Sequence, residues 1–211
     1  MKITDNVFKL DSTKGAYAYI IVDNGITFID TGMSKHGEKI LKELKDNKLK
    51  YRDIRTILLT HHDVDHIGNV ELMANKVKCN IYIDENDLPY AVGQKKRKGL
   101  KRLISYIYKC KVPSTTKKLS RYPFNHIDYI HTPGHTPGHN CYVYKNVMFV
   151  GDLVREKSGK VLLTPAIWAW NKNELIYSCI TLPMDGIQWI CPAHGEPFAI
   201  DKWNQFIRTL K

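Results

Sequence analysis

The chain has 211 residues, 43% of them hydrophobic and 25% charged, an ordinary globular composition that predicts a single domain over residues 1–211. It lacks the ~18 consecutive apolar residues that a membrane span needs, and MKITDNVFKL at its start lacks the apolar core of a signal peptide. The five cysteines are odd in number and contain no CxxC pair, which argues against a disulfide framework or a zinc finger. We therefore expect a cytoplasmic protein with no membrane partner.

The formal net charge of +11 is confined to one segment. Residues 88–127 contain eleven lysines and arginines and no acidic residue, whereas the rest of the chain balances 21 basic with 21 acidic residues. The charge is thus a property of one insertion and not of the fold as a whole.

The first half of the chain predicts strands and helices in alternation. Residues 16–32 indicate a hairpin turning at Asn24-Gly25, and residues 34–49 indicate a helix with Ser34 as its N-cap. Residues 54–60 form a β-branched apolar run typical of a buried strand ending at Thr60. A helix over 66–77 and a strand over 80–84 follow, and the basic residues 95–112 predict an amphipathic helix.

The second half predicts strands within 129–144 and 147–152, a helix over 174–183, a strand and loop over 187–195, and a closing helix near 203–210. Early hairpins followed by alternating strands and helices favour an α/β or α+β fold with sheets between helices.

Polar clusters follow five of these apolar strands. They contain Asp30; His61 to His66; His131 and His135; Asp152; and His194. Active groups in such folds gather in loops at the carboxyl ends of strands, so these loops can converge at one sheet edge. Imidazole and carboxylate together suit Zn²⁺, Fe or Mn²⁺, and this many ligands suits two metals bridged by a carboxylate and a water. Such a bridging water would be a hydroxide near neutral pH.

The motifs THHDVDHIG, GHTPGH, VGD and PAHGEP, in this order and at fitting separations, resemble the metallo-β-lactamase superfamily over nearly the whole chain. The resemblance implies an α+β fold, the four-layer αβ/βα sandwich, with the basic insertion at about 88–127. It also implies a binuclear metal site. His61, Asp63 and His135 would hold the first metal, Asp65, His66 and His194 the second, and Asp152 would bridge them. Asp30 matches the buried aspartate that braces the ligand loops, and His139 is assigned to a supporting role beside His135.

Asp63 departs from the common HxHxDH pattern, which has a histidine there. Aspartate is a harder ligand and adds a negative charge, so it shifts preference toward iron or manganese. Zinc stays the first expectation from the resemblance, with Fe or Mn second. Some branches of the family carry an acidic residue here, including flavodiiron proteins, where it is glutamate and the metal is iron.

The remaining histidines are given structural roles. His62 is expected to be exposed or packed on a helix, because it alternates with the ligands. His36 and His126 are expected at the surface, and His131 in a structural or supporting role.

Three interpretations of the basic insertion stay open. It is a solvated helix, a cap that favours acidic substrates, or a nucleic-acid surface on which Tyr106, Tyr108 and Tyr122 stack. Nucleic acid ranks third because the family's nucleases carry an extra domain.

The leading hypothesis is a metal-dependent hydrolase of a small-molecule ester, thioester or lactone. A metal-bridging hydroxide would attack the substrate, with Asp65 as the catalytic group that orients the water. The alternatives are a phosphodiesterase or nucleic-acid hydrolase, and a non-catalytic metal-binding regulatory protein of the same fold. A redox role is a third class, weakened by the absence of an electron-delivering domain.

Overall fold

The computed structural model describes residues 1–119 and 126–210. Contacts along the chain divide it into two compact units, which we call unit 1 (residues 1–119) and unit 2 (residues 120–211). The prediction of one domain over residues 1–211 stays a prediction. None of the helices in the described part has the length and apolar character needed to cross a membrane.

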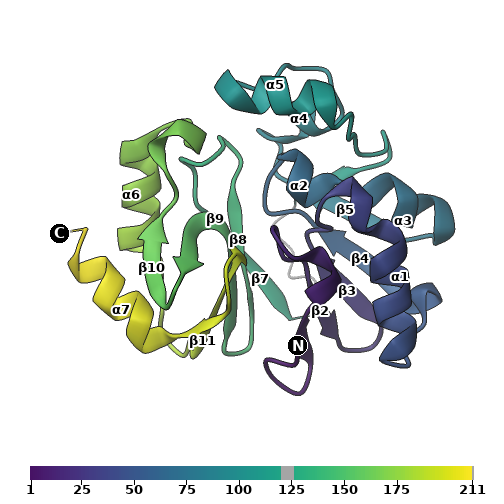
Figure 1. Cartoon of the computed structure of the whole chain (residues 1–211), viewed down its shortest axis with the longest axis horizontal. Helices are drawn as coiled ribbons and strands as arrows, with labels where there is room; N and C mark the ends of the chain where they lie inside the picture. Colours follow the sequence, from purple (N-terminus) through teal and green to yellow (C-terminus); the bar gives the residue numbers. More distant parts are fainter. Residues whose placement is uncertain (120–125, 211) are drawn as a thin grey trace. The chain divides into compact units, whose positions relative to one another are not determined.

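Unit 1 is built on a six-stranded sheet in the order β1-β2-β3-β4-β5-β6 (Figure 1). The first three strands pair antiparallel and the last three join them in parallel. The strands are β1 (Val7–Lys9), β2 (Tyr19–Val22), β3 (Ile26–Ile29), β4 (Ile54–Leu58), β5 (Asn80–Ile83) and β6 (Lys117–Lys118). The expected hairpin is present between β2 and β3, and both turn residues, Asn24 and Gly25, have positive φ. β1 and β6 were missed because they are only three and two residues long.

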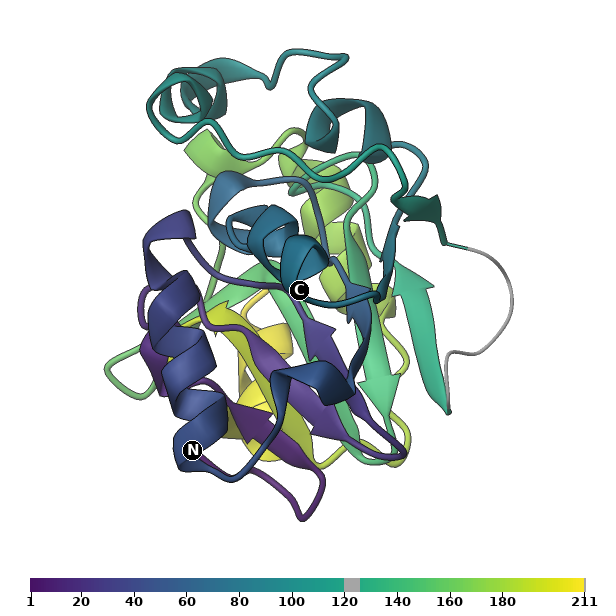
Figure 2. The same cartoon turned by 90° about the vertical axis from the view of Figure 1, so that its right-hand side faces the viewer.

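Five helices accompany this sheet: α1 (Gly37–Asp46), α2 (Val64–Ile67), α3 (Val70–Lys76), α4 (Leu88–Ala91) and α5 (Gly99–Ile107). The apolar side chains of α1 and α3, among them Ile40, Leu44 and Met73, pack with Phe28 and Ile57 of the sheet in one buried cluster. In Figure 1 and Figure 2 alike, α4 and α5 lie at the same end of unit 1.

The start of α1 differs from the prediction. Ser34 opens a short 3-10 turn and α1 itself begins at Gly37, so the N-cap position belongs to His36, whose side chain makes no capping bond. The predicted helix over 66–77 is also divided, into α2 and α3, by Gly68 and Asn69. A Cβ on Gly68 would overlap the backbone nitrogen of Ser34, so the chain can pass here only without a side chain.

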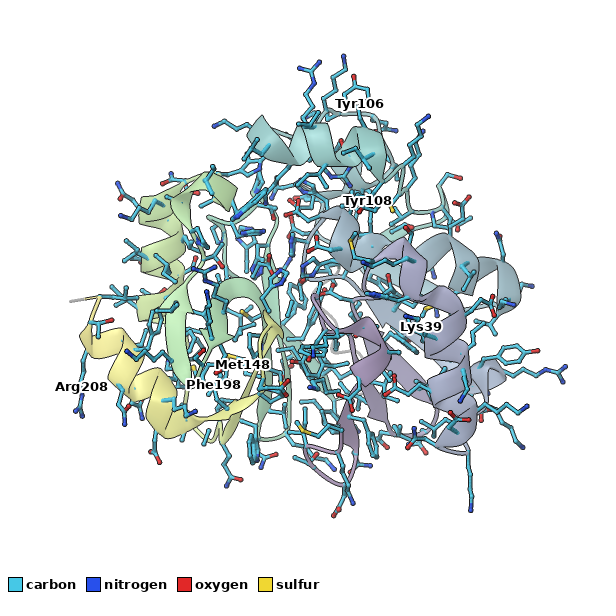
Figure 3. All side chains as sticks on the ribbon, viewed as in Figure 1. Lys39, Tyr106, Tyr108, Met148, Phe198 and Arg208 are labelled. Carbon is cyan, nitrogen blue, oxygen red and sulfur yellow. The ribbon has the colours of Figure 1, made fainter. Side chains whose placement is uncertain are left out.

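Unit 2 contains a second mixed sheet in the order β12-β11-β9-β8-β7, with β10 paired to β9. Its elements are β7 (Ile127–His131), β8 (Asn140–Tyr144), β9 (Val147–Lys157), β10 (Lys160–Leu163), α6 (Lys172–Thr181), β11 (Trp189–His194), β12 (Phe198–Ala199) and α7 (Ile200–Arg208). Leu175 and Cys179 of α6 and Trp203 of α7 share one buried cluster with Met148 and Phe198, the last two of which are labelled in Figure 3. Both helices therefore cover this sheet with their apolar side chains.

All five cysteines are free, as the sequence predicted. Cys141, Cys179 and Cys191 are buried. Burial raises the pKa of the Cys141 thiol to about 12 and holds the pKa of Cys191 well above its usual value. These three side chains act as small apolar groups and not as reactive thiols.

Candidate metal centre

The loop after β4 carries four of the predicted ligands: His61, Asp63, Asp65 and His66. Asp63 is the residue directly before α2, and its backbone oxygen accepts the N–H groups of His66 and Ile67 (3.0 and 3.1 Å). This single turn of helix folds the loop tightly. His61 and Asp63 approach to 3.3 Å between Nε2 and Oδ2, and ligand atoms of Asp65 and His66 lie within 4.8 Å of each other.

Asp30, which is 3% exposed, makes the hydrogen bonds that the resemblance implied. Its Oδ1 accepts the backbone N–H of Thr60 (2.8 Å), and its Oδ2 accepts the Thr60 hydroxyl (2.7 Å) and lies 2.7 Å from Nδ1 of His66. The residue sits at φ 59, directly after β3. One buried carboxylate thus ties the end of β3 to both ends of the ligand loop.

These bonds determine the tautomers of His61 and His66. A carboxylate accepts only, so the proton between Asp30 and His66 belongs to Nδ1 of the histidine. The Thr60 hydroxyl gives its proton to Asp30, so it must accept from Nδ1 of His61, 3.0 Å away. In both rings Nε2 is left with the lone pair, which is the nitrogen a metal would use.

Unit 2 contains the other three predicted ligands, and two of them, both histidines, face the carboxylate of the third. Oδ2 of Asp152 lies 3.4 Å from Nε2 of His135 and 3.3 Å from Nε2 of His194. His135 follows β7, and His194 is the last residue of β11, as expected of strand ends. Asp152 differs from the prediction. It lies inside β9, which continues to Lys157.

The chain bends where Asp152 enters the site. Gly151, just before it, has φ 48, and the pairing of β9 with β11 shifts register at this point. β9 pairs with β8 before the bend and with β10 after it. A bulge of this kind redirects one side chain without ending the strand. Because apolar residues continue beyond Asp152, the sequence gives no sign of the bulge.

His139 holds the backbone of Asp152. Its Nε2 accepts the Asp152 N–H (3.1 Å), so the proton is on Nδ1, which donates to the hydroxyl of Thr132 (2.9 Å). On the other side, the hydroxyl of Thr164 donates to the Asp152 carbonyl (2.7 Å). The predicted supporting role of His139 therefore has a definite form, in which a buried imidazole and a threonine clamp the bend.

The spacing of these groups fits a metal ion. Tetrahedral coordination at bonds of about 2.0–2.1 Å separates neighbouring ligand atoms by roughly 3.3–3.4 Å. The three nitrogen–oxygen distances are 3.3 Å for His61–Asp63, 3.4 Å for His135–Asp152 and 3.3 Å for His194–Asp152. Imidazole nitrogens facing carboxylate oxygens suit a divalent cation, and three pairs of predicted ligands, one in unit 1 and two in unit 2, are of this kind.

Two histidine predictions need correction. His36 is buried because the turn before α1 folds it inward, and burial, with Lys35 and Lys39 nearby, lowers its pKa. His62 is fully buried, not exposed. Its Nδ1 lies 2.8 Å from Oδ2 of Asp87, and its ring stacks on Tyr90 of α4 at 4.8 Å. The alternative of packing on a helix was right, although the helix is α4.

The other two lie at the surface. His126 is exposed, as predicted. His131, for which a structural or supporting role was predicted, is also exposed, and its Nε2 lies 3.0 Å from the carbonyl oxygen of Pro137 in the loop carrying His135.

The basic insertion is only partly a solvated helix. Arg97 and Lys101 are buried: Arg97 donates to the His62 carbonyl through Nε and Nη2, and Lys101 Nζ lies 2.6 Å from Oδ2 of Asp63. Burial lowers the pKa of Arg97, and the carboxylate of Asp63 opposes that shift. Tyr106 projects outward from α5 (Figure 3) and Tyr108 is half-buried. Tyr122, the third tyrosine of the stacking interpretation, lies outside the described residues.

Sequence reasoning missed the residues that hold the ligand loop from this side. Asp87 also accepts the backbone N–H of His62 (3.0 Å), and its position just before Leu88-Pro89 at the start of α4 is a recognisable N-cap signal. Arg97 lies before α5 and Lys101 lies within it, and the uniform charge of the segment gives no reason to single them out. Their partners lie more than 30 residues away, so no local pattern identifies them.

Comparison with known proteins places the chain in one family. The family model described as the metallo-β-lactamase superfamily matches residues 13–194. A Bacillus subtilis protein named as a probable metallo-hydrolase, YybB, is 27% identical over 179 residues, covering 81% of this chain and 76% of that protein. Hydroxyacylglutathione hydrolase of Buchnera aphidicola is 28% identical over 66% of this chain. The chain spans about half of that relative, because the match covers 47% of its length.

Solved structures share the fold. Rm3 metallo-β-lactamase aligns with a TM-score of 0.74 at 18% identity, covering all of this chain (100%) and 91% of that one. TTHA1623, solved in a di-iron-bound form, aligns with a TM-score of 0.67 at 23% identity, over 90% of this chain and 92% of that one. The predicted α+β sandwich fold is therefore confirmed, and the chain is a member of the metallo-β-lactamase superfamily, with Bacillus and Buchnera relatives that are named as hydrolases.

Proposed function

We propose that this protein is a binuclear metal-dependent hydrolase of a small-molecule ester, with thioesters first, then esters and lactones. The observation that carries the proposal is the paired donor set: Nε2 of His61 facing Asp63, and His135 and His194 facing Asp152, all at 3.3–3.4 Å. Thioesters come first because two relatives are named hydroxyacylglutathione hydrolase.

Seven residues would hold two divalent ions: His61, Asp63, Asp65, His66, His135, Asp152 and His194. When bound, such ions supply a nucleophilic oxygen near neutral pH and polarise the scissile carbonyl. The chain supplies orientation. Asp30 and Thr60 hold the rings of His61 and His66, and Asp65 in the first turn of α2 is the group we assign to orienting water and carrying its proton.

Zinc is our first choice of metal, with iron or manganese second. Carboxylate at position 63 is a harder donor than imidazole and supports the second choice. A similar fold is known with two irons, in TTHA1623. Elemental analysis of the purified protein distinguishes these metals, and we also keep the cytoplasmic location as a prediction.

The testing experiment is a turnover screen of metal-loaded protein on generic thioesters, esters, lactones and phosphodiesters. We expect turnover of the acyl substrates, and a fall of at least about 100-fold in kcat for Asp65→Asn, because one group of the general acid–base type contributes on this scale. Asp46→Asn, on the exposed face of α1, is the matched control. Intact turnover in Asp65→Asn would remove Asp65 from the mechanism. Turnover of phosphodiesters alone would favour the alternative of a phosphodiesterase or nucleic-acid hydrolase.

A preference for acidic acyl substrates is the second part of the proposal. Of the cations in the insertion, those that are exposed include Lys95, Lys96, Lys98 and Arg102. A field of one sign beside a reaction site concentrates substrates of the opposite sign. The triple change of Lys96, Lys98 and Arg102 to Gln should raise KM for an anionic ester and leave KM for its neutral analogue unchanged. An equal effect on both substrates would rule out the electrostatic explanation.

A further inference from the structure

The insertion places a buried lysine on Asp63, the ligand at which this chain departs from the common family pattern. Lys101 Nζ and Asp63 Oδ2 are 2.6 Å apart, and the side chains are only 6% and 11% exposed. An ammonium group is expensive to bury without a partner, so the pair exists as a unit.

The orientation of α5 shows that this contact takes precedence over ordinary burial. Lys101 faces inward, while Leu103 and Ile107 of the same helix are 62% and 69% exposed. Apolar burial alone would rotate α5 the other way, since leucine and isoleucine are normally inside and lysine outside. Arg97, in the segment just before α5, donates to the carbonyl of His62 and ties that segment to the ligand loop.

The charges explain why a lysine is there. A histidine at position 63 would be a neutral ligand, whereas Asp63 adds one negative charge. Lys101 supplies one positive charge on the same carboxylate oxygen that lies 3.3 Å from Nε2 of His61. The Asp63–Lys101 pair therefore has the net charge of the histidine it replaces.

We propose that Lys101 is a positioning residue that neutralises Asp63 and weakens the binding of a divalent metal at the His61–Asp63 position relative to the second position. The proposal rests on the metal site proposed above. Lys101 contacts the Asp63 oxygen that faces His61, so its charge would withdraw electron density from that donor and would repel a cation held there. By Coulomb's law, removing one positive charge about 5 Å from a divalent ion strengthens binding by roughly tenfold or more, even at the dielectric constant of water.

The test is a calorimetric zinc titration of metal-stripped protein, in wild type and in Lys101→Gln. Glutamine keeps a hydrogen-bond donor for Asp63 and removes the charge. We expect two classes of zinc in the wild type, and a weaker class that becomes roughly tenfold tighter in the variant. Lys101→Arg retains the charge and should bind zinc as the wild type does, and the apo-protein melting temperature checks that each variant is folded.

The matched control is Lys109→Gln, which removes an exposed cation from the same insertion and should change zinc affinity by less than about twofold. If the weaker class of zinc binds Lys101→Gln no more tightly than it binds the wild type, the inference is overturned and the metal site itself is unaffected. A wild type and variant that both bind no zinc, iron or manganese overturn the proposed function as well.

Discussion

Asp30 is the residue on which the ligand loop of unit 1 depends, because it accepts three bonds, two from Thr60 and one from His66. We expect Asp30→Asn to lose at least one of them, since an amide presents only one accepting oxygen. Disturbing a group that orients a ligand histidine typically lowers metal affinity by about 10- to 100-fold.

Competition of the protein with a chromophoric chelator for zinc measures this affinity, and Asp46→Asn serves as the exposed control. Asp30→Asn that binds zinc as tightly as the wild type would contradict the bracing role.

His36 makes the stability of the folded protein depend on pH. Its pKa is lowered in the folded protein, first by burial and then by Lys35 and Lys39. The unfolded chain then binds more protons than the folded chain once the pH falls below the usual histidine pKa of about 6.5, so this residue makes the protein less stable as the pH falls through that value.

Urea unfolding of the metal-free protein at pH 7.5 and 5.5 measures the effect. His36→Asn should lose less stability between the two pH values than the wild type, whereas His126→Asn, at an exposed position, should lose as much as the wild type. Equal losses in His36→Asn and wild type would show that His36 does not titrate in this range.

At the scale of elements, Gly134 determines how the loop carrying His135 meets α6. It has φ +128, and a Cβ on it would overlap the backbone nitrogen of Leu175. Its carbonyl accepts the N–H groups of Trp170 and Asn171 (2.8 and 3.0 Å), just before the helix. The loop therefore stands directly on the first turn of α6, with no room for a side chain.

Gly134→Ala should destabilise the protein by roughly 2–4 kcal/mol, from backbone strain together with overpacking. Urea unfolding followed by tryptophan fluorescence measures this change. Gly159→Ala is the matched control, because it also has positive φ (+82) but meets nothing within 4 Å. A loss equal to that of Gly159→Ala would mean that strain alone, and not the contact with α6, governs the position.

At the scale of the whole molecule, metal binding should be coupled to stability. Ligand pairs such as His135 and Asp152 are brought together only in the folded chain, so an ion bound there stabilises it by mass action. At 100 times its dissociation constant, an ion adds about 2.7 kcal/mol, which raises the melting temperature of a chain of this size by roughly 5–10 °C.

Thermal unfolding with added zinc, and after removal of metal by a chelator, measures this coupling. Magnesium is the control, because it prefers six oxygen ligands and should have little effect. A melting temperature that does not respond to zinc, iron or manganese would favour the non-catalytic alternative without metal.

The fold class, the hairpin at Asn24-Gly25 and the strands that precede the ligand loops could all be predicted from the amino-acid sequence. Periodicity and turn chemistry depend on neighbouring residues, and the order of the motifs can be read directly along the chain. The histidines and aspartates predicted as metal ligands also came from the order of the motifs, and the structure adds the 3.3–3.4 Å spacing of three of their pairs.

The burial, direction and ion pairing of these residues could be seen only in the tertiary structure. His36 and His62 are buried, Asp152 projects from a bend inside β9, and Lys101 turns inward to Asp63 while its apolar neighbours face solvent. His62 and Lys101 depend on Asp87 and Asp63, and the bend in β9 depends on β11, all of which are distant in sequence. Burial and ion pairing arise from contacts between segments, so a charge run that locally favours a solvated helix can supply the cation that balances a buried ligand.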